Sequence, residues 1–142
     1  MVNHYSRKVQ IHISLFFSII MTICLLFVFS GKVYAEDNTI VVDGFEYSVS
    51  GGTATLVSYK GTKKGVVVPS KVNGIPIKAI NQGAFYDNDI IESIIFSEGL
   101  EFINPEFAIF CHNLQYIYIP STTNVDGCII TECPKVKTIE LS

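Results

Sequence analysis

The residue pair Cys111-His112 is the first candidate for chemistry, because a thiol beside an imidazole can supply a nucleophile and its base. Such a pair works only when the two side chains meet in space, with an orienting group and oxyanion donors around them. Neighbouring side chains in an extended or tightly turned segment usually diverge, so we interpret Cys111 as a buried cysteine and His112 as an exposed turn residue. We therefore predict that the protein is not an enzyme and has neither catalytic residues nor a cofactor.

Metal binding is the second candidate chemistry. The potential zinc ligands are Cys111, His112, Cys128 and Cys133. Structural zinc sites usually contain two cysteines separated by about two to four residues, and Cys128-x4-Cys133 is a loose fit to that spacing. The turn Asp87–Asp89 does not by itself supply the roughly six to eight oxygens of a calcium site, and turn chemistry explains these residues. We predict no metal site.

Residues 1–35 have the pattern of a secretory signal peptide. Arg7 and Lys8 precede a long apolar run, 13–30, and Ala35 ends a small-residue cleavage site. The apolar run is also about long enough to span a bilayer, so an uncleaved membrane anchor is the alternative. We predict cleavage after Ala35 and a protein that is secreted or lies at the cell surface, with membrane contact only through this segment if it is retained.

Residues 36–142 are acidic and contain no arginine. They hold all thirteen Asp and Glu residues of the chain but only seven lysines, so their formal net charge is −6. Binding to phosphate backbones needs clustered Lys and Arg, and we therefore predict no nucleic-acid partner. The length suits one domain with a modest core.

A repeat of 22 to 23 residues organises the second half of the chain. Segments that begin at Ile80, Ile103 and Val125 align without a gap. Their further apolar columns are Ile91/Leu114/Val136, Ile94/Ile117/Ile139 and Phe96/Ile119/Leu141. The last two columns lie two residues apart, so they should point inward from one short strand of each coil. A period in the low twenties with an L-x-x-I-x-I core predicts a leucine-rich-repeat solenoid, in which stacked coils bury a continuous core.

These repeats resemble one family, the BspA-type leucine-rich repeats of bacterial and some protist surface proteins. Gly83-Ala84-Phe85 is similar to the family's xAF segment, and residues 110–122, "FCHNLQYIYIPST", are similar to its F-x-x-C-x-x-L-x-x-I-x-I-P pattern with the cysteine displaced. Residues 66–80 resemble the segment that leads into the first full repeat. The resemblance implies roles in adhesion to host or matrix proteins or to other cells. The second and third units, "EFAIF" and "CIITEC", depart from the pattern, and we expect less regular packing there.

We predict a mainly β fold, a short right-handed leucine-rich-repeat solenoid with an N-terminal β-hairpin cap. Residues 1–35 are the signal peptide, residues 36–65 the cap and residues 66–142 the repeats. The pairs Asp43-Gly44 and Gly51-Gly52 indicate tight turns between antiparallel strands of the cap. The repeats should form one parallel sheet, with irregular or helical turns on the other side.

Cys111 and Cys133 occupy the same repeat position, one coil apart. Neighbouring strands lie about 4.8 Å apart, which is within the range of roughly 4.4–6.8 Å for bridged Cα atoms. The two residues therefore form either a disulfide or a ladder of reduced, buried thiols, and we favour the ladder because both side chains would point the same way. With Cys128 the count after residue 35 is odd, so at most one internal disulfide can form.

Strand residues that alternate with the inward columns must face outward, and together they make the candidate binding surface. This surface, called the sheet face below, comprises Val67, Ser93, Ile95, Tyr116, Tyr118, Thr138 and Glu140. Exposed tyrosines favour binding because each ring gives contact area at little entropic cost, although aromatic and β-branched residues also simply suit strands. We predict a non-enzymatic recognition module that binds a protein or glycan ligand in adhesion or host interaction. The alternative is a structural remnant or capping fragment of a longer repeat protein, without binding activity of its own.

The C-terminal end of the repeats has no evident cap. Val136, Ile139 and Leu141 are followed only by Ser142. A solenoid needs polar terminal caps, and an unpaired strand edge recruits other strands. We predict a partly open core at this end and self-association through the C-terminal edge.

Overall fold

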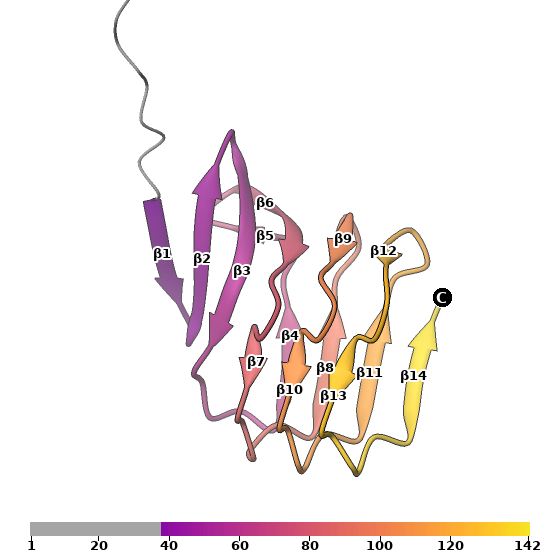
Figure 1. Ribbon diagram of the computed structural model, residues 1–142. Helices are drawn as coiled ribbons and strands as arrows, with labels where there is room; N and C mark the ends of the chain where they lie inside the picture. Colours follow the sequence, from indigo (N-terminus) through magenta and orange to yellow (C-terminus); the bar gives the residue numbers. More distant parts are fainter. Residues whose placement is uncertain (1–37) are drawn as a thin grey trace, which may run out of the picture. The chain divides into compact units, whose positions relative to one another are not determined.

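The computed structural model describes residues 38–142, and every regular element in this range is a β-strand (Figure 1). The strands form three sheets around one interior, so the predicted mainly β solenoid is confirmed. The predicted signal peptide, residues 1–35, lies outside the described residues. Residues 38–142 include no helix long and apolar enough to cross a membrane.

The first sheet takes one strand from each of four successive coils. Its strands are β4 (Gly65–Val68), β8 (Ser93–Phe96), β11 (Tyr116–Ile119) and β14 (Thr138–Leu141). All are parallel and follow one another in coil order. Ile117 pairs with Ile94 on one side and with Ile139 on the other, as the repeat predicts. The register expected from the sequence is therefore the register of the structure.

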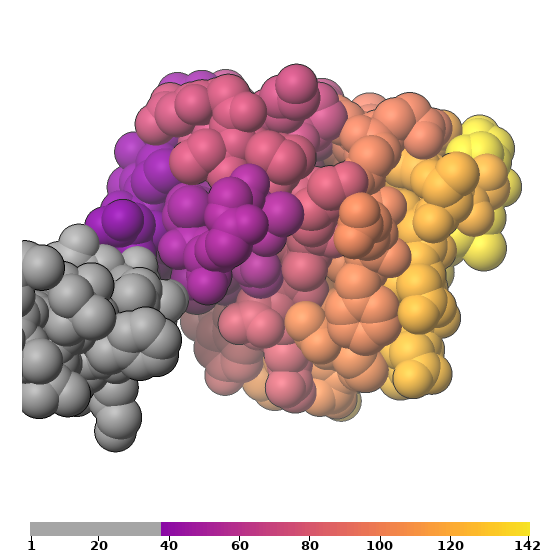
Figure 2. Space-filling model, turned by 90° about the horizontal axis from the view of Figure 1, so that it is seen from above, coloured from indigo at the N-terminus to yellow at the C-terminus, as the bar shows by residue number. Residues whose placement is uncertain are grey.

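The other two sheets complete each coil. The three-stranded sheet consists of β7 (Phe85–Tyr86), β10 (Ala108–Ile109) and β13 (Ile130–Thr131). The seven-stranded sheet consists of β1 (Asn38–Val42), β2 (Phe45–Ser50), β3 (Thr53–Tyr59), β5 (Lys71–Val72), β6 (Ile75–Ile80), β9 (Phe102–Ile103) and β12 (Asn124–Val125). Figure 2 shows the coils of the described part following one another from the cap to the C-terminus.

The three-stranded sheet is more regular than the sequence predicted. We expected irregular or helical turns and uneven packing in the second unit, but β10 pairs in register with both β7 and β13. The second unit reverses a large and a small residue: Ala108 pairs with Phe85, and Phe107 precedes it. Both Phe107 and Ala108 are fully buried. The Phe107 ring packs against Phe96 and Phe85 with ring centroids 5.4 and 6.1 Å apart, so the exchange fills the same interior.

The N-terminal cap is a three-stranded antiparallel unit. The predicted hairpin is β2–β3, and β1 adds a third strand. Asp43-Gly44 and Gly51-Gly52 form the two connections, and all four residues have φ between 52° and 83°. Positive φ at both central residues is the type I′ geometry that matches the twist of a hairpin. Strand β3 then pairs in parallel with β6, so the cap continues the seven-stranded sheet.

Aromatic rings join the cap to the first coil. Phe45 of β2 packs on Tyr59 at a centroid distance of 4.6 Å, and Tyr59 packs on Phe85 at 5.7 Å. All three side chains are buried. These rings continue the core of the repeats and close its N-terminal end.

The C-terminal end of the core is open. Ile117 and Ile139 occupy the same repeat position, but Ile117 is 0% exposed and Ile139 is 41% exposed. Leu141 is 64% exposed, whereas its counterpart Ile119 is 0% exposed. Within residues 38–142, β14 is the end strand of its sheet, which accounts for the exposure of these two side chains.

One corner of each coil has the same unusual backbone geometry. Asp87, Phe110 and Glu132 stand at the same repeat position, with φ of 52°, 55° and 53°. Left-handed φ is uncommon outside glycine, so the sharp bend here is a built feature of the coil. The Phe110 ring lies edge-on to Tyr86 at 5.8 Å, which gives this residue contacts that a glycine would lack.

Candidate functional site

The structure brings all seven predicted sheet-face residues onto the four-stranded sheet. Their pairing forms two rows across the strands, Val67–Ile95–Tyr118–Glu140 and Ser93–Tyr116–Thr138. Val67 is 57% exposed and Ile95 is 37% exposed, while Thr138 and Glu140 are also exposed. Ser93, Tyr116 and Tyr118 are partly buried. The face therefore changes from apolar at β4, through aromatic at β11, to polar at β14.

The two tyrosines are tied to the last coil. Tyr116 Oη donates a hydrogen bond of 2.7 Å to Glu140 Oε2, and Tyr118 Oη donates one of 3.2 Å to the Ser142 carbonyl oxygen. The hydrogen bond to Glu140 raises the pKa of Tyr116. Sequence analysis placed these side chains outward but missed their partners. Tyr116 and Glu140 are diagonal neighbours on adjacent strands, a spacing that long side chains can bridge.

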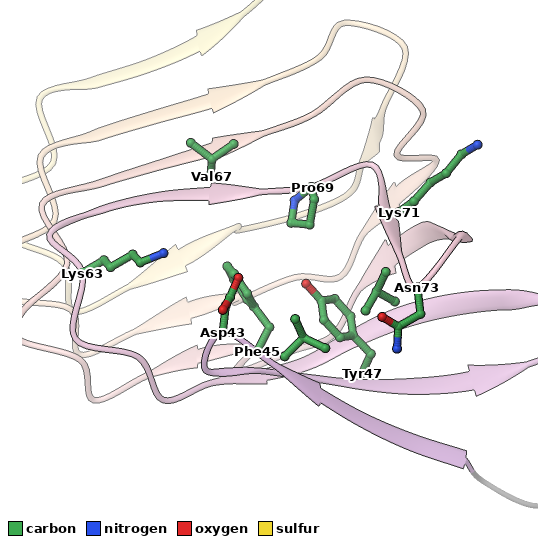
Figure 3. Close-up of a pocket in the computed structure, with 10 residues that line it drawn as sticks. Asp43, Phe45, Tyr47, Lys63, Val67, Pro69, Lys71 and Asn73 are labelled. Carbon is green, nitrogen blue, oxygen red and sulfur yellow. The ribbon is translucent and has the colours of Figure 1, made fainter.

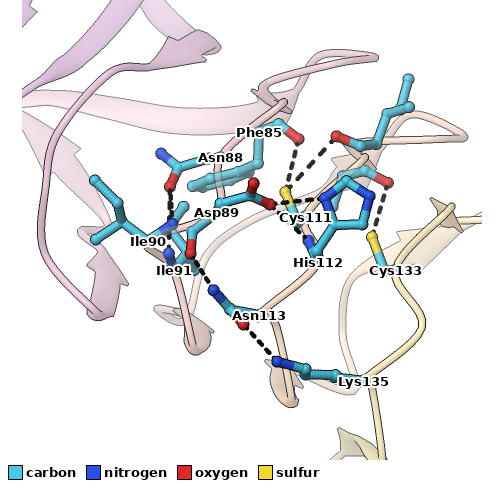
Figure 4. Close-up of polar contacts among 12 residues, drawn as sticks. Phe85, Asn88, Asp89, Ile90, Ile91, Cys111, His112, Asn113, Cys133 and Lys135 are labelled. Carbon is cyan, nitrogen blue, oxygen red and sulfur yellow. Dashed lines mark hydrogen bonds and ion pairs between the residues drawn. The ribbon is translucent and has the colours of Figure 1, made fainter.

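A polar ladder crosses the turns of three successive coils (Figure 4). His112 Nδ1 lies 2.7 Å from Asp89 Oδ1, and the His112 backbone N–H donates to the same oxygen. Asn113 Nδ2 donates to the Asp89 carbonyl oxygen, and Lys135 Nζ donates to Asn113 Oδ1 at 2.7 Å. The hydrogen bonds from His112 lower the pKa of Asp89. These side chains connect coil to coil on an exposed surface, where such contacts are individually weak.

The predicted turn at Asp87–Asp89 is formed by local hydrogen bonds. Asn88 Oδ1 accepts from the backbone N–H groups of Ile90 and Ile91, at 3.0 and 3.2 Å. This side-chain-to-backbone pattern is a common turn device. Across residues 38–142, the His, Cys, Asp and Glu side chains form no group of three or more that could hold a metal ion.

Cys111 and His112 point to different partners. The Cys111 thiol is fully buried and donates to the Phe85 carbonyl oxygen at 3.3 Å, whereas the exposed His112 ring faces Asp89. Hydrogen bonding to Cys133 and burial raise the pKa of Cys111, which disfavours its thiolate. The pair is therefore not arranged as a nucleophile and base.

All three cysteines of the described residues are free thiols. Cys133 is half-buried, and its Sγ lies 3.3 Å from the Thr131 carbonyl oxygen and 3.7 Å from that of Ala108. The hydrogen bond from Cys111 lowers the pKa of Cys133. Cys111 and Cys133 thus stand in adjacent coils as two interacting thiols, while Cys128 is exposed.

The solved structures that this fold resembles are leucine-rich-repeat proteins. No protein-family model and no curated protein matches the sequence. A leucine-rich-repeat protein of T. pallidum superposes with a TM-score of 0.62 and 20% identity over 72% of this chain and 49% of that one. A leucine-rich-repeat protein of Bacteroides capillosus gives a TM-score of 0.57 and 19% identity over 73% of this chain and 98% of that one.

These likenesses define the class by its fold, the leucine-rich-repeat solenoid. The chain spans about half the length of the T. pallidum protein. Both similar proteins are leucine-rich-repeat proteins, and this fold is generally non-enzymatic and commonly presents surfaces for recognition.

Proposed function

We propose that this protein is a non-enzymatic recognition module that binds a protein or glycan ligand through its sheet face. The observation that carries the proposal is the exposure of Val67 and Ile95 beside the tyrosines of β11. Apolar and aromatic groups gathered on one accessible face favour binding over solvation. The polar residues Thr138 and Glu140 border this patch, as a polar rim borders the centre of many interfaces.

The rigidity of the sheet supports the same proposal. The residues that alternate with the sheet face, such as Ile94 and Ile117, are fully buried. Strands fixed from behind by a packed core hold their outward side chains in place, so little conformational entropy is lost when a ligand binds. The tyrosine hydroxyls are also positioned before binding, because Tyr116 and Tyr118 already contact the last coil.

Adhesion or host interaction is the role that we propose for this module, at the cell surface or in secreted form. The signal-like pattern of residues 1–35 and the resemblance to BspA-type repeats support this location. Both arguments come from the sequence and are independent of the sheet face.

The sheet face can be tested with two substitutions that leave the tyrosine hydrogen bonds intact. The full chain would be passed over immobilised purified matrix proteins and cell-wall polysaccharides. We expect it to bind at least one, and we expect the double variant Val67→Ser/Ile95→Ser to bind that ligand about tenfold more weakly or worse. Val41→Ser is the matched control, because Val41 is 70% exposed on β1, outside the sheet face. Equal binding by both variants, or no binding at all, would contradict the proposal.

A second candidate function is favoured by the exposed core residues Ile139 and Leu141. In this case the chain acts as a capping unit of a longer repeat stack and has no ligand of its own. The two candidates differ in the binding experiment above, since a capping unit gives no signal on any surface.

A further inference from the structure

A pocket of about 300 Å³ lies between the N-terminal cap and the first strand of the four-stranded sheet (Figure 3). Val42, Phe45, Val67, Pro69 and Val72 supply its apolar lining, and Asp43, Tyr47, Lys63, Lys71 and Asn73 supply polar groups. Sequence analysis did not find this site, because its walls come from two separate segments, 42–47 and 63–73. Its volume matches one or two side chains, too small for a folded partner but suitable for part of an extended chain.

The pocket lies beside an unpaired strand edge. Strand β4 is the end strand of its sheet in residues 38–142, with β8 on one side only. The carbonyl oxygens of Lys64 and Val68 accept hydrogen bonds from the β8 segment, at 2.7 Å from Glu92 and 3.1 Å from Ser97. Backbone groups of successive residues point to opposite sides of a strand, so the N–H and C=O of Val67 face the pocket side. A free edge of this kind can pair with an added strand.

Tyr47 supplies a hydroxyl at the wall of the pocket. Its side chain is only 1% exposed and lines the pocket beside Phe45. In Figure 3 the hydroxyl points across the pocket toward Pro69. Burial, together with the nearby Asp43 carboxylate, raises the pKa of Tyr47 to about 12, so the group is a hydrogen-bond donor at neutral pH. The hydroxyl can therefore donate a hydrogen bond to a ligand that enters the pocket.

Two lysines line this pocket. Within residues 38–142, the ammonium groups of Lys63 and Lys71 form no ion pair. By contrast, Lys64 and Lys78 pair with carboxylates at 2.7 and 2.8 Å. Figure 3 shows the ammonium of Lys63 directed toward the pocket and that of Lys71 directed away from it, so Lys63 is the cation that a bound ligand would meet. An acidic group therefore complements the site.

We propose that an extended acidic peptide adds as a strand to the free edge of β4 and places one carboxylate side chain in this pocket. The peptide backbone pairs with Val67, the carboxylate accepts from the ammonium of Lys63 and the hydroxyl of Tyr47, and its methylene stem lies on Phe45. A glycan carrying a carboxylate would match the lysines but would leave the strand edge unused. This site shares Val67 with the sheet face but does not depend on the function proposed above.

The test uses a fluorescein-labelled, end-capped peptide of alternating valine and threonine with one central glutamate. The full chain would be titrated into it and the fluorescence anisotropy recorded. We expect saturable binding that weakens about tenfold or more when the glutamate is replaced by glutamine, and likewise when the backbone nitrogens on one edge of the peptide are methylated. Equal affinity of all three peptides, or no binding, would overturn the proposal.

Variants of the protein locate the binding on this edge. Lys63→Gln and Tyr47→Phe should each weaken binding severalfold to about tenfold, and Lys137→Gln is the control because Lys137 is exposed and far along the chain on the last coil. Val67→Pro should abolish strand addition, since proline removes the outward N–H while edge strands tolerate it. If circular dichroism shows that Val67→Pro does not fold, the methylated peptide still tests whether the peptide backbone pairs with β4.

The same experiment distinguishes two other occupants of this site, a glycan and a second copy of the chain. A glycan site predicts that a soluble oligouronate displaces the peptide while peptide methylation has no effect. A second copy of this chain predicts that Val67→Pro changes the sedimentation coefficient of the protein alone. Either result would overturn the proposal of a peptide partner.

Discussion

At the N-terminal end of the stack, the rings of Phe45 and Tyr59 cover the first coil, whereas at the C-terminal end Ile139 and Leu141 are left exposed. The side chains at the C-terminal end are those of the ordinary repeat, and the same positions one coil earlier are fully buried. Burial is therefore set by the presence of a neighbouring coil and not by residue type. The contribution of a repeat position to the free energy of unfolding should therefore be larger in a central coil than in the last coil.

The largest expected effect compares Ile117 with Ile139. Ile117→Ala should lower the free energy of unfolding by about 2–5 kcal/mol, because it leaves a cavity between two packed coils. Ile139→Ala should lower it by about 1 kcal/mol, because that side chain is already partly solvated. Urea denaturation of residues 36–142, which form one compact unit, measures both. Similar losses for the two variants would mean that the last coil is covered in solution.

The second prediction concerns the turns of the cap. A Cβ at Gly44 would lie 2.7 Å from Gly61 Cα, whereas a Cβ at Gly51 meets nothing within 4 Å. Both residues have left-handed φ, so alanine at either position costs about 1–2 kcal/mol. Gly44→Ala should cost roughly 1–3 kcal/mol more, because the backbone must shift. Equal denaturation midpoints for the two variants would show that the cap is loosely attached to the stack.

The third prediction concerns self-association at the open end. Light scattering on residues 36–142 should show a mass that rises with concentration, because β14 presents an unpaired edge and two exposed core residues. Leu141→Lys should shift this equilibrium toward the monomer by placing a charge at the edge. Val41→Lys, on the exposed β1 strand, is the control. A monomer at every concentration would exclude the C-terminal edge as a contact.

The smallest expected effect is a difference in thiol reactivity between Cys111 and Cys133, which lie in adjacent coils. In native residues 36–142, a thiol reagent should modify exposed Cys128 and half-buried Cys133, whereas Cys111 should react only after unfolding. The hydrogen bond from Cys111 lowers the pKa of Cys133, which favours its reactive thiolate. Peptide mapping would identify the labelled sites. Protection of both Cys111 and Cys133, lifted only by a reductant, would establish the disulfide alternative instead.

The pairing register of the coils was predictable, because the apolar residues recur every 22 to 23 positions in the sequence. The columns of Ile94, Ile117 and Ile139 repeat without a gap, and a one-residue slip would have turned them all outward. The regularity of the three-stranded sheet was not predictable from the family pattern, since the exchange of Phe107 and Ala108 preserves volume while it changes the motif. A packed interior tolerates substitutions that keep the total side-chain volume, whereas a sequence motif specifies residue types at fixed positions.

The candidate sites were predictable only in part. The outward direction of Tyr116 follows from strand alternation, but its hydrogen bond to Glu140 depends on a diagonal contact between coils. The pocket at β4 depends on where the cap turns, and Tyr47 and Lys63 meet there from segments with no shared pattern. Alternation fixes the direction of a side chain along one strand, whereas partners from other segments require the assembled fold.

The left-handed backbone conformation at Asp87, Phe110 and Glu132 recurs at the same repeat position, so successive coils bend at the same point. Strand β11 pairs in the same repeat register with β8 and with β14, so the middle coil meets both of its neighbours at equivalent positions. Copying residues 103–124 in tandem would therefore lengthen the stack by one strand spacing, about 4.8 Å, and leave both ends as they are. Each such duplication would lengthen the sheet face by one strand and would place Phe107 and Ala108 beside copies of themselves at the new junction.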